Sequence, residues 1–225
     1  MKLLELTGIK NKIGNDKEIT DIAIDLLKKN YKLLGTGSFG TVFDNPKKPN
    51  EVIKFWFNDP GYEHFLKVAK SINSPHLINV IKQGSITLNL ETPVTIKYAR
   101  LEKLEYATEV DGINIDNFVF LVSQTLDVDN GRDFIDQIYQ LVNDNRNSIV
   151  DFMDFKEFSK DTIECIHVIK KLSDKAKSFE WDLHSGNIMR RGNTLVVVDP
   201  YYSHDAKSIL SFNRKLHAFL QSQYD

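Results

Sequence analysis

The chain has 225 residues, of which 41% are hydrophobic and 27% are charged, a composition that can bury one sizeable core or two smaller ones. A formal net charge of -2, with both signs mixed along the chain, excludes the basic footprint of a nucleic-acid-binding arm. A single cysteine, Cys165, excludes an internal disulfide and a cysteine-based metal cluster. No signal peptide or membrane-spanning stretch stands out, so we expect a cytoplasmic protein.

The first half of the chain predicts one helix followed by a strand-rich lobe. Apolar residues recur at helical spacing over residues 16–29. The lobe that follows extends to about residue 104. Its predicted strands are separated by Gly, Pro and Asn turns and cover residues 31–34, 41–44, 52–56, 86–90 and 95–101. One further helix is predicted inside this lobe, at residues 60–72.

Two features of the strand-rich lobe indicate that it binds phosphate groups. Glycines at positions 35, 37 and 40 form a Gly-x-Gly-x-x-Gly-x-Val run that ends at Val42. Backbone amides there can approach phosphates because no Cβ stands in the way. Lys54, on the next strand, carries a flexible ammonium that can reach phosphates as a point charge. The same glycine spacing marks dinucleotide-binding folds, but it then leads into a helix, whereas here it leads into another strand.

The second half of the chain predicts a mainly helical lobe. Apolar faces at helical spacing predict helices over residues 131–145 and 161–179, and a shorter pattern of the same kind covers 208–221. Phenylalanines between the first two helices add to the core (Phe152, Phe155 and Phe158). Because ligand pockets favour the junction between domains, we expect the ligand between the two lobes.

Three polar residues of the second half form a pattern that suits phosphoryl transfer. Asp182 and Asn187 lie in one loop, and Asp199 ends the apolar strand 195–198. Mg²⁺ is a hard ion that takes few protein ligands, all of them oxygens. The pattern can therefore hold Mg²⁺ on a nucleotide and orient an attacking hydroxyl. A lone Asp in a loop is usually a cap or turn residue, so the interpretation depends on the three residues together.

The order of these motifs resembles the protein-kinase-like superfamily over about residues 31–202. The sequence Asp-Leu-His-Ser-Gly-Asn-Ile-Met at 182–189 and the Asp-Pro at 199–200 most resemble the early serine/threonine protein kinase of short-tailed (podovirus) coliphages. Aminoglycoside and choline kinases share the Asp-Leu-His-x-Gly-Asn motif. The resemblance implies an α+β, minimal bilobal fold with an antiparallel-sheet N-lobe (1–104) and a small, mainly helical, truncated C-lobe (105–225).

The resemblance also implies ATP and Mg²⁺ as cofactors, host proteins as substrates, and a role for each site residue. Asp182 would accept or orient the proton of the attacking hydroxyl, while Asn187 and Asp199 would supply oxygen ligands to Mg²⁺. Lys54 would bind the phosphates, and Glu63 would pair with it. The glycine loop and backbone groups of a hinge would cover the rest of the nucleotide, at Gly35, Gly37, Ser38, Phe39, Gly40, Val42, Glu102 and Leu104.

Departures from the family pattern are informative as well. Trp181 stands where typical protein kinases have Arg, so no Arg is present to hold a phosphorylated activation loop. Pro200-Tyr201 replaces their Phe-Gly, and because Pro fixes φ we expect Asp199 to be held in place. His184, where a Lys is common, can bind phosphate when charged or brace the loop, and we favour bracing. No protein-substrate platform is predicted after Asp199, so the acceptor either docks on residues 105–160 or is small.

Three functions fit these residues. The favoured one is a Mg-ATP-dependent phage serine/threonine protein kinase acting on host proteins. The first alternative is a small-molecule kinase of the aminoglycoside or choline kinase type. The second is a catalytically silent kinase-like module that inhibits a host protein by binding, and the presence of Lys54, Asp182, Asn187 and Asp199 counts against it. Transfer of AMP in place of phosphate stays open as well.

Overall fold

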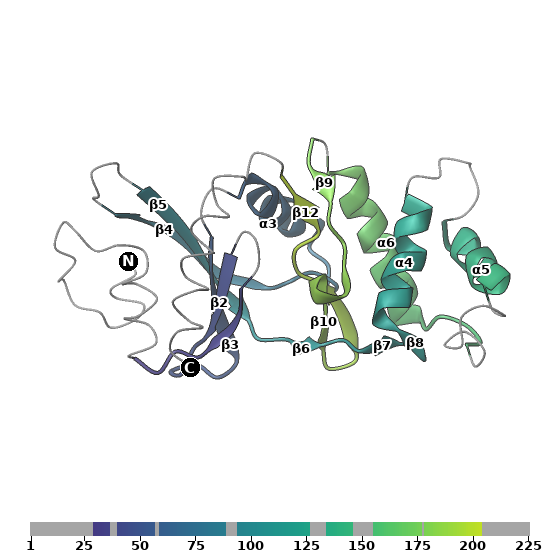
Figure 1. Ribbon diagram of the computed structural model, residues 1–225, viewed down its shortest axis with the longest axis horizontal. Coiled ribbons are helices and arrows are strands. Elements are labelled where there is room, and N and C mark those ends of the chain that lie inside the picture. Colours follow the sequence, from purple (N-terminus) through teal and green to yellow (C-terminus); the bar gives the residue numbers. More distant parts are fainter. Residues whose placement is uncertain are drawn as a thin grey trace, which may run out of the picture. The chain divides into compact units, whose positions relative to one another are not determined.

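In the computed structural model of the chain, the described residues form two compact units (Figure 1). The sheet unit comprises described residues of 29–60 and 79–103, and the helical unit those of 61–78 and 104–203. The structure describes residues 29–36, 40–56, 59–88, 94–126, 134–145, 155–176 and 178–203. The helices predicted at 16–29 and 208–221 lie outside these ranges, apart from residue 29, and so does Phe152.

The sheet unit is a five-stranded antiparallel sheet with the strand order β1-β2-β3-β5-β4. Its strands are β1 (Leu33–Thr36), β2 (Gly40–Asp44), β3 (Glu51–Trp56), β4 (Val80–Leu88) and β5 (Val94–Glu102). Aromatic and branched side chains fill its core, among them Phe43, Ile53 and Tyr98, each at most 2% exposed. The sequence predicts all five strands, but β4 begins at Val80 and not at residue 86. Its first half reads Val-Ile-Lys-Gln-Gly, without a regular alternation of polar and apolar residues, so the sequence shows no strand pattern there.

The helical unit contains α3 (Pro60–Ile72, from Gly61 on), α4 (Ile115–Leu126), α5 (Phe134–Asn145) and α6 (Lys160–Asp174). Between and after them lie short strands and one 3₁₀ turn: β6 (Glu105–Tyr106), β7 (Glu109–Val110), β8 (Ile113–Asn114), β9 (Glu180–Trp181), η2 (Ser185–Asn187), β10 (Ile188–Arg191), β11 (Thr194–Val197) and β12 (Tyr201–Tyr202). In Figure 1, α4 lies beside α6, and α5 lies beside α4.

The core of the helical unit lies between α4, α6 and β11. Side chains from all three elements are almost completely buried: Phe118, Leu121 and Val122 from α4, Ile166, Ile169 and Leu172 from α6, and Val196 and Val197 from β11. Phe155 and Phe158, predicted as core, are 3% and 4% exposed. The observed α+β class, with an antiparallel-sheet unit and a mainly helical unit, confirms the fold class that the sequence predicts.

Helix α3 packs within the helical unit, although the sequence analysis included residues 60–72 in the N-lobe. Its first turn lies on β12, because a Cβ added at Gly61 would be only 3.2 Å from the carbonyl oxygen of Tyr201. The ring of Phe65, one turn further, meets the ring of Tyr201 edge-on at 6.2 Å. Glycine at position 61 therefore permits the close approach of α3 to the strand that follows Asp199.

Tyr201 joins several elements of the helical unit. Its side chain is 2% exposed, and its hydroxyl donates a 2.6 Å hydrogen bond to the carbonyl oxygen of Leu172, near the end of α6. Its ring contacts the rings of His64, Phe179 and Trp181 at centroid distances of 5.5, 6.5 and 5.9 Å. Burial raises the pKa of the Tyr201 hydroxyl, which keeps it protonated as a donor. One side chain thus ties α3, α6 and β9 to β12.

The part of the chain that the structure describes holds no helix long and apolar enough to cross a membrane.

We predict that Tyr201→Phe lowers the free energy of unfolding by about 0.5–1.5 kcal/mol, since it removes a buried hydrogen bond and leaves the Leu172 carbonyl only the N–H of Lys175. Urea titration followed by circular dichroism measures this change. Tyr106→Phe is the matched control, because Tyr106 is 70% exposed and its hydroxyl has nothing buried to satisfy. Equal stability of the two variants would refute the anchoring role of Tyr201.

Candidate active site

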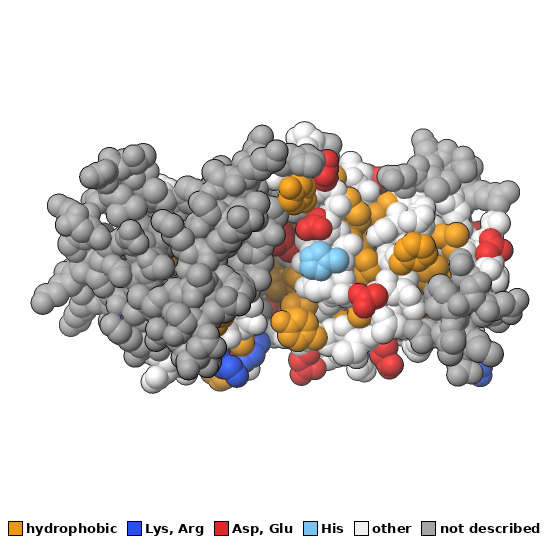
Figure 2. All heavy atoms as spheres, viewed as in Figure 1, with side chains coloured by type: hydrophobic (Ala, Val, Ile, Leu, Met, Phe, Trp, Pro, Cys, Tyr) orange, Lys and Arg blue, Asp and Glu red, His pale blue; other side chains and the backbone are white. Residues whose placement is uncertain are grey.

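The pairing of β9 with β12 brings Asp182 and Asp199 together in the helical unit. In this antiparallel pair Trp181 lies opposite Tyr201, and the backbone N–H of Asp182 donates a 2.8 Å hydrogen bond to the carbonyl oxygen of Pro200. Asp199 follows the buried strand β11 and directly precedes Pro200. Figure 2 shows acidic side chains and a histidine gathered on one face of this unit.

Asn187 is fixed between the same two segments. It is 8% exposed and lies at the end of η2. Its side-chain Nδ2 donates a 2.8 Å hydrogen bond to the backbone carbonyl of Asp182. The backbone carbonyl oxygen of Asn187 accepts a hydrogen bond from the N–H of Val198 at 3.0 Å. Because only the amide nitrogen can donate to a carbonyl, Oδ1 is the side-chain atom of Asn187 that can face a cation.

The carboxyl group of Asp182 has a raised pKa. Burial is the largest cause, His184 would oppose it when protonated, and the negative charge of Asp199 adds to it. Burial therefore brings the pKa of this carboxyl group closer to the range that suits a general base than the pKa of an exposed Asp. Since Asp199 contributes to this pKa shift, the two carboxylates are close enough to interact electrostatically.

His184 braces the loop that carries Asn187. Its Nδ1 accepts a 3.1 Å hydrogen bond from the backbone N–H of Gly186, and it occupies the N-cap position of η2. A Cβ at Gly186 would lie 2.9 Å from Cε1 of the imidazole, so glycine is needed for this arrangement. The contact agrees with the bracing role that the sequence analysis favours.

The donor set of these residues fits a magnesium ion. Asn187 offers an amide oxygen, Asp199 offers a carboxylate whose Oδ1 is shielded from solvent, and Asp182 offers a second carboxylate. All are hard oxygen donors, the type that Mg²⁺ prefers. No nitrogen or sulfur ligand is needed.

The sheet unit brings the predicted phosphate-binding residues onto adjacent strands. Val42 of β2 lies opposite Gly35 of β1 and Lys54 of β3. A Cβ at Gly40 would lie 2.9 Å from the backbone oxygen of Phe55 and 3.0 Å from Cε of Lys54, so the lysine side chain passes directly over this glycine. The remaining loop residues, Gly37, Ser38 and Phe39, lie outside the described residues.

The other predicted nucleotide contacts are distributed over both units. Glu63 lies in the first turn of α3, in the helical unit, whereas Lys54 lies in the sheet unit, and their pairing stays a prediction. Glu102 ends β5, and its carboxylate accepts a 2.7 Å hydrogen bond from the N–H of Asn79. Leu104 is the first residue of the chain's return to the helical unit. The adenine contacts of Glu102 and Leu104 also stay predictions.

Sequence reasoning missed the part that Tyr201 plays in this site. The sequence shows only that Tyr replaces a glycine two residues after Asp199. The available signal was the adjacent aromatic pair Tyr201 and Tyr202, with Phe179 and Trp181 about twenty residues earlier on the other side of the Asp182 loop. Aromatic side chains of that size need a buried partner surface, which α3 and α6 provide.

No protein-family model matches this chain, and no curated protein matches it. Among solved structures, the chain is similar to a gentamicin complex of the aminoglycoside phosphotransferase APH(2")-IIa, at 13% identity and a TM-score of 0.33, covering 92% of this chain and 82% of the other. It is also similar to ADP-bound APH(2'')-Ib, at 14% identity and a TM-score of 0.30, covering 91% and 82%. Because these TM-scores are below 0.5, the function must be inferred from the chain's own residues.

We predict that Asp182→Asn raises the melting temperature at neutral pH. A carboxyl group whose pKa is raised on folding stabilises the protein below its unfolded pKa, and this contribution is lost as the pH rises through the folded pKa. The ionised carboxylate therefore opposes folding at pH 7, and the neutral amide removes that cost. The gain should shrink as the pH falls through the range in which Asp182 becomes protonated.

Thermal unfolding of both proteins between about pH 4 and pH 8 measures this difference. Glu157→Gln serves as the control, since Glu157 is an exposed carboxylate on a loop, and it should show no such pH-dependent gain. A melting temperature of Asp182→Asn that is lower than wild type at pH 7 would show that this carboxylate is a structural residue.

Proposed function

We propose that this chain is a Mg-ATP-dependent phosphotransferase of the protein-kinase-like fold, and that it phosphorylates serine and threonine hydroxyls of host proteins. The observation that carries the proposal is the β9–β12 pairing, which brings a carboxylate of raised pKa, a buried amide and a second carboxylate into one site. Phosphoryl transfer needs these three groups, because its catalysis consists mainly of positioning and charge stabilisation.

Each group has a distinct part in the proposed reaction. Asp182 accepts the proton of the acceptor hydroxyl while the hydroxyl oxygen forms a bond to the γ-phosphorus and the bond from phosphorus to ADP breaks. Asn187 Oδ1 and the Asp199 carboxylate hold Mg²⁺, which supplies neutralising charge for the phosphate oxygens. The hydrogen bond from Asn187 Nδ2 to the Asp182 carbonyl fixes the position of the proposed base relative to the proposed metal ligand.

The sheet unit supports the nucleotide part of the proposal. Lys54 extends from β3 across Gly40, so its side chain and the backbone of Gly40 lie on one surface. A phosphate chain bound there would meet a cation and backbone N–H groups together. A side chain at position 40 would push Lys54 aside and collide with the backbone of β3.

A protein acceptor is favoured over a small one by exposed aromatic surface in the segment 105–160. Phe120 on α4 is 50% exposed, and Tyr106 on β6 is 70% exposed. Figure 2 shows hydrophobic side chains at the surface in the region of α4. Exposed aromatic residues are typical of protein-binding surfaces, where they are enriched relative to the rest of the surface.

We predict that Asp182→Asn lowers the rate of transfer by roughly 10²–10⁴-fold while the affinity for ATP stays within a few fold, because this residue acts on the acceptor proton. Asp199→Asn should weaken Mg-ATP binding as well, since it removes a metal ligand. The assay incubates each protein with γ-labelled ATP and host lysate, and isothermal calorimetry measures nucleotide affinity.

Labelled protein bands that disappear with Asp182→Asn support the proposal. Label that enters only small molecules would identify a small-molecule kinase. Host interference that survives both substitutions, with no label transferred, would identify a silent binding module. Mass spectrometry of the modified residue distinguishes added phosphate from added AMP.

We also predict that Gly40→Ala weakens ATP binding roughly tenfold, because the new methyl group displaces Lys54 and presses on the Phe55 carbonyl. Ser85→Ala is the control in the same sheet, since Ser85 is an exposed residue of β4 outside the glycine run, and its affinity should stay within about twofold. Equal ATP affinities of the two variants would disprove the proposed path of Lys54 over Gly40.

A further inference from the structure

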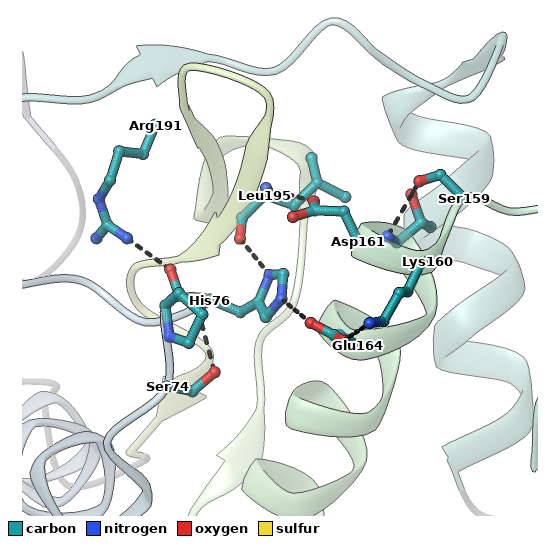
Figure 3. A network of polar contacts seen from close by, with 10 residues as sticks. Ser74, His76, Ser159, Lys160, Asp161, Glu164, Arg191 and Leu195 are labelled. Carbon is teal, nitrogen blue, oxygen red and sulfur yellow. Dashed lines mark hydrogen bonds and ion pairs between the residues drawn. The ribbon is translucent and has the colours of Figure 1, made fainter.

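A cavity of about 400 Å³ in the helical unit is lined by none of the residues of the proposed active site. The loop that follows α3 forms one side of it, with Ser74 and His76, and α6 forms the other side, with Glu164, His167 and Lys171. Figure 3 shows the polar network at this place, where the side chain of His76 extends from the loop toward α6. The cavity therefore joins two elements that the chain separates by almost ninety residues.

The ring of His76 is held in one orientation. Its side chain is 2% exposed, and Nδ1 donates a 2.9 Å hydrogen bond to the carbonyl oxygen of Leu195. Because a carbonyl can only accept, Nδ1 carries the proton, and the neutral ring has its lone pair on Nε2. This Nε2 is buried and has no hydrogen-bond partner among the described residues. Histidines that bind metals are typically oriented in this way, by an N–H bonded to a backbone carbonyl.

The nearest group to Nε2 is a carboxylate oxygen of Glu164, Oε2, at 3.6 Å (Figure 3). This distance is too long for a direct hydrogen bond. A water or ammonium group bridging both atoms at about 2.8 Å with a tetrahedral angle would hold them about 4.6 Å apart. With a tetrahedral angle, two ligands of one zinc ion at about 2.0–2.2 Å from the metal lie about 3.3–3.6 Å apart. The observed separation is within ion-pair range if the imidazole is protonated, and with a neutral ring it also fits two ligands of one metal ion.

His76 and Glu164 both line the cavity, and the charged side chains around them leave this side of the pair open. Lys160 approaches the other oxygen of Glu164, Oε1, at 3.7 Å, and its side chain is 91% exposed. His167 lies on α6 one turn after Glu164 and lines the same cavity. As the side chains lie, no three His, Cys, Asp or Glu of the described residues are placed to hold a metal together. The fold therefore supplies two ligands, with water for the remaining positions.

We propose that His76 Nε2 and Glu164 Oε2 bind a divalent transition metal ion, of which Zn²⁺ suits an imidazole and a carboxylate best. The metal links the loop after α3 to α6. The same loop is bonded to β11, because Val197 N–H donates to the carbonyl of His76 at 2.9 Å, and Ile78 N–H donates to that of Val197 at 3.3 Å. The bound metal thereby fastens the segment that leads into Asp199.

Isothermal calorimetry and thermal unfolding test the site on the full chain, stripped with a chelator and titrated with ZnCl₂, with MgCl₂ for comparison. We expect Zn²⁺ to bind and to raise the melting temperature. Glu164→Gln should weaken binding at least tenfold, and its 52% exposed side chain makes it safe for folding. His76→Gln should have the same effect. Lys171→Gln is the control, since it lines the same cavity but supplies no metal ligand, and it should keep the affinity.

Zinc binding of wild-type strength in Glu164→Gln would overturn the proposal, because the ion would then occupy other residues, such as the carboxylates of the active site. Absence of any zinc-dependent heat or melting shift in the wild type would overturn it too. Loss of binding with His167→Gln but not with His76→Gln would show a surface site on α6 and contradict the role of His76. Since none of these readouts is catalytic, they are independent of the proposed phosphotransferase function.

Discussion

The pairing of β9 with β12 is the constraint on which the candidate active site depends. Each strand has only two residues, and a strand pair of that length is not stable by itself. The pair persists because Tyr201 is anchored on both sides, by its hydroxyl on Leu172 of α6 and by its ring against Phe65 of α3. Hydrophobic burial of Tyr201 thus brings Asp182 and Asp199 together.

This arrangement places an electrostatic cost where the chemistry requires it. Burial and the charge of Asp199 both raise the pKa of Asp182, so the folded protein opposes its ionisation. Strained or costly groups of this kind cluster at functional sites and are maintained by the stability of the surrounding structure. In this protein that stability comes from the core of α4, α6 and β11, which is formed mainly by apolar side chains.

Local patterns predicted much of the fold, and the misses have physical reasons. Helix α3 begins and ends at the predicted residues, because Pro60 suits the first helical position and the apolar spacing is regular. Helix α6 ends at Asp174 and not at 179, since turns that involve Ala176 and Phe179 replace its last part. Helix α4 was not identified, because the run Phe118 to Val122 is apolar nearly throughout and shows no clear period.

For the candidate site, the sequence predicted some of the residues and missed others. The residues proposed to carry the chemistry, Lys54, Asp182, Asn187 and Asp199, were predicted from the order and spacing of their motifs. The residues that hold their segments in place act through contacts distant in the chain, and sequence spacing does not predict such contacts. Tyr201 was noticed only as a replacement for a glycine, and no spacing singled out His76. Both contact elements more than twenty residues away in the chain.

The packing of α3 has a consequence for control of the proposed enzyme. Gly61 and Phe65 fasten this helix to the strand that follows Asp199, so Glu63 belongs to the same unit as the proposed metal ligands. Moving Glu63 away from that site would require breaking the aromatic contacts of Tyr201 and exposing buried side chains to water. A switch that swings α3 alone is therefore costly. With Pro200 restricting the backbone after Asp199, the helical unit is built to keep one arrangement of its catalytic groups.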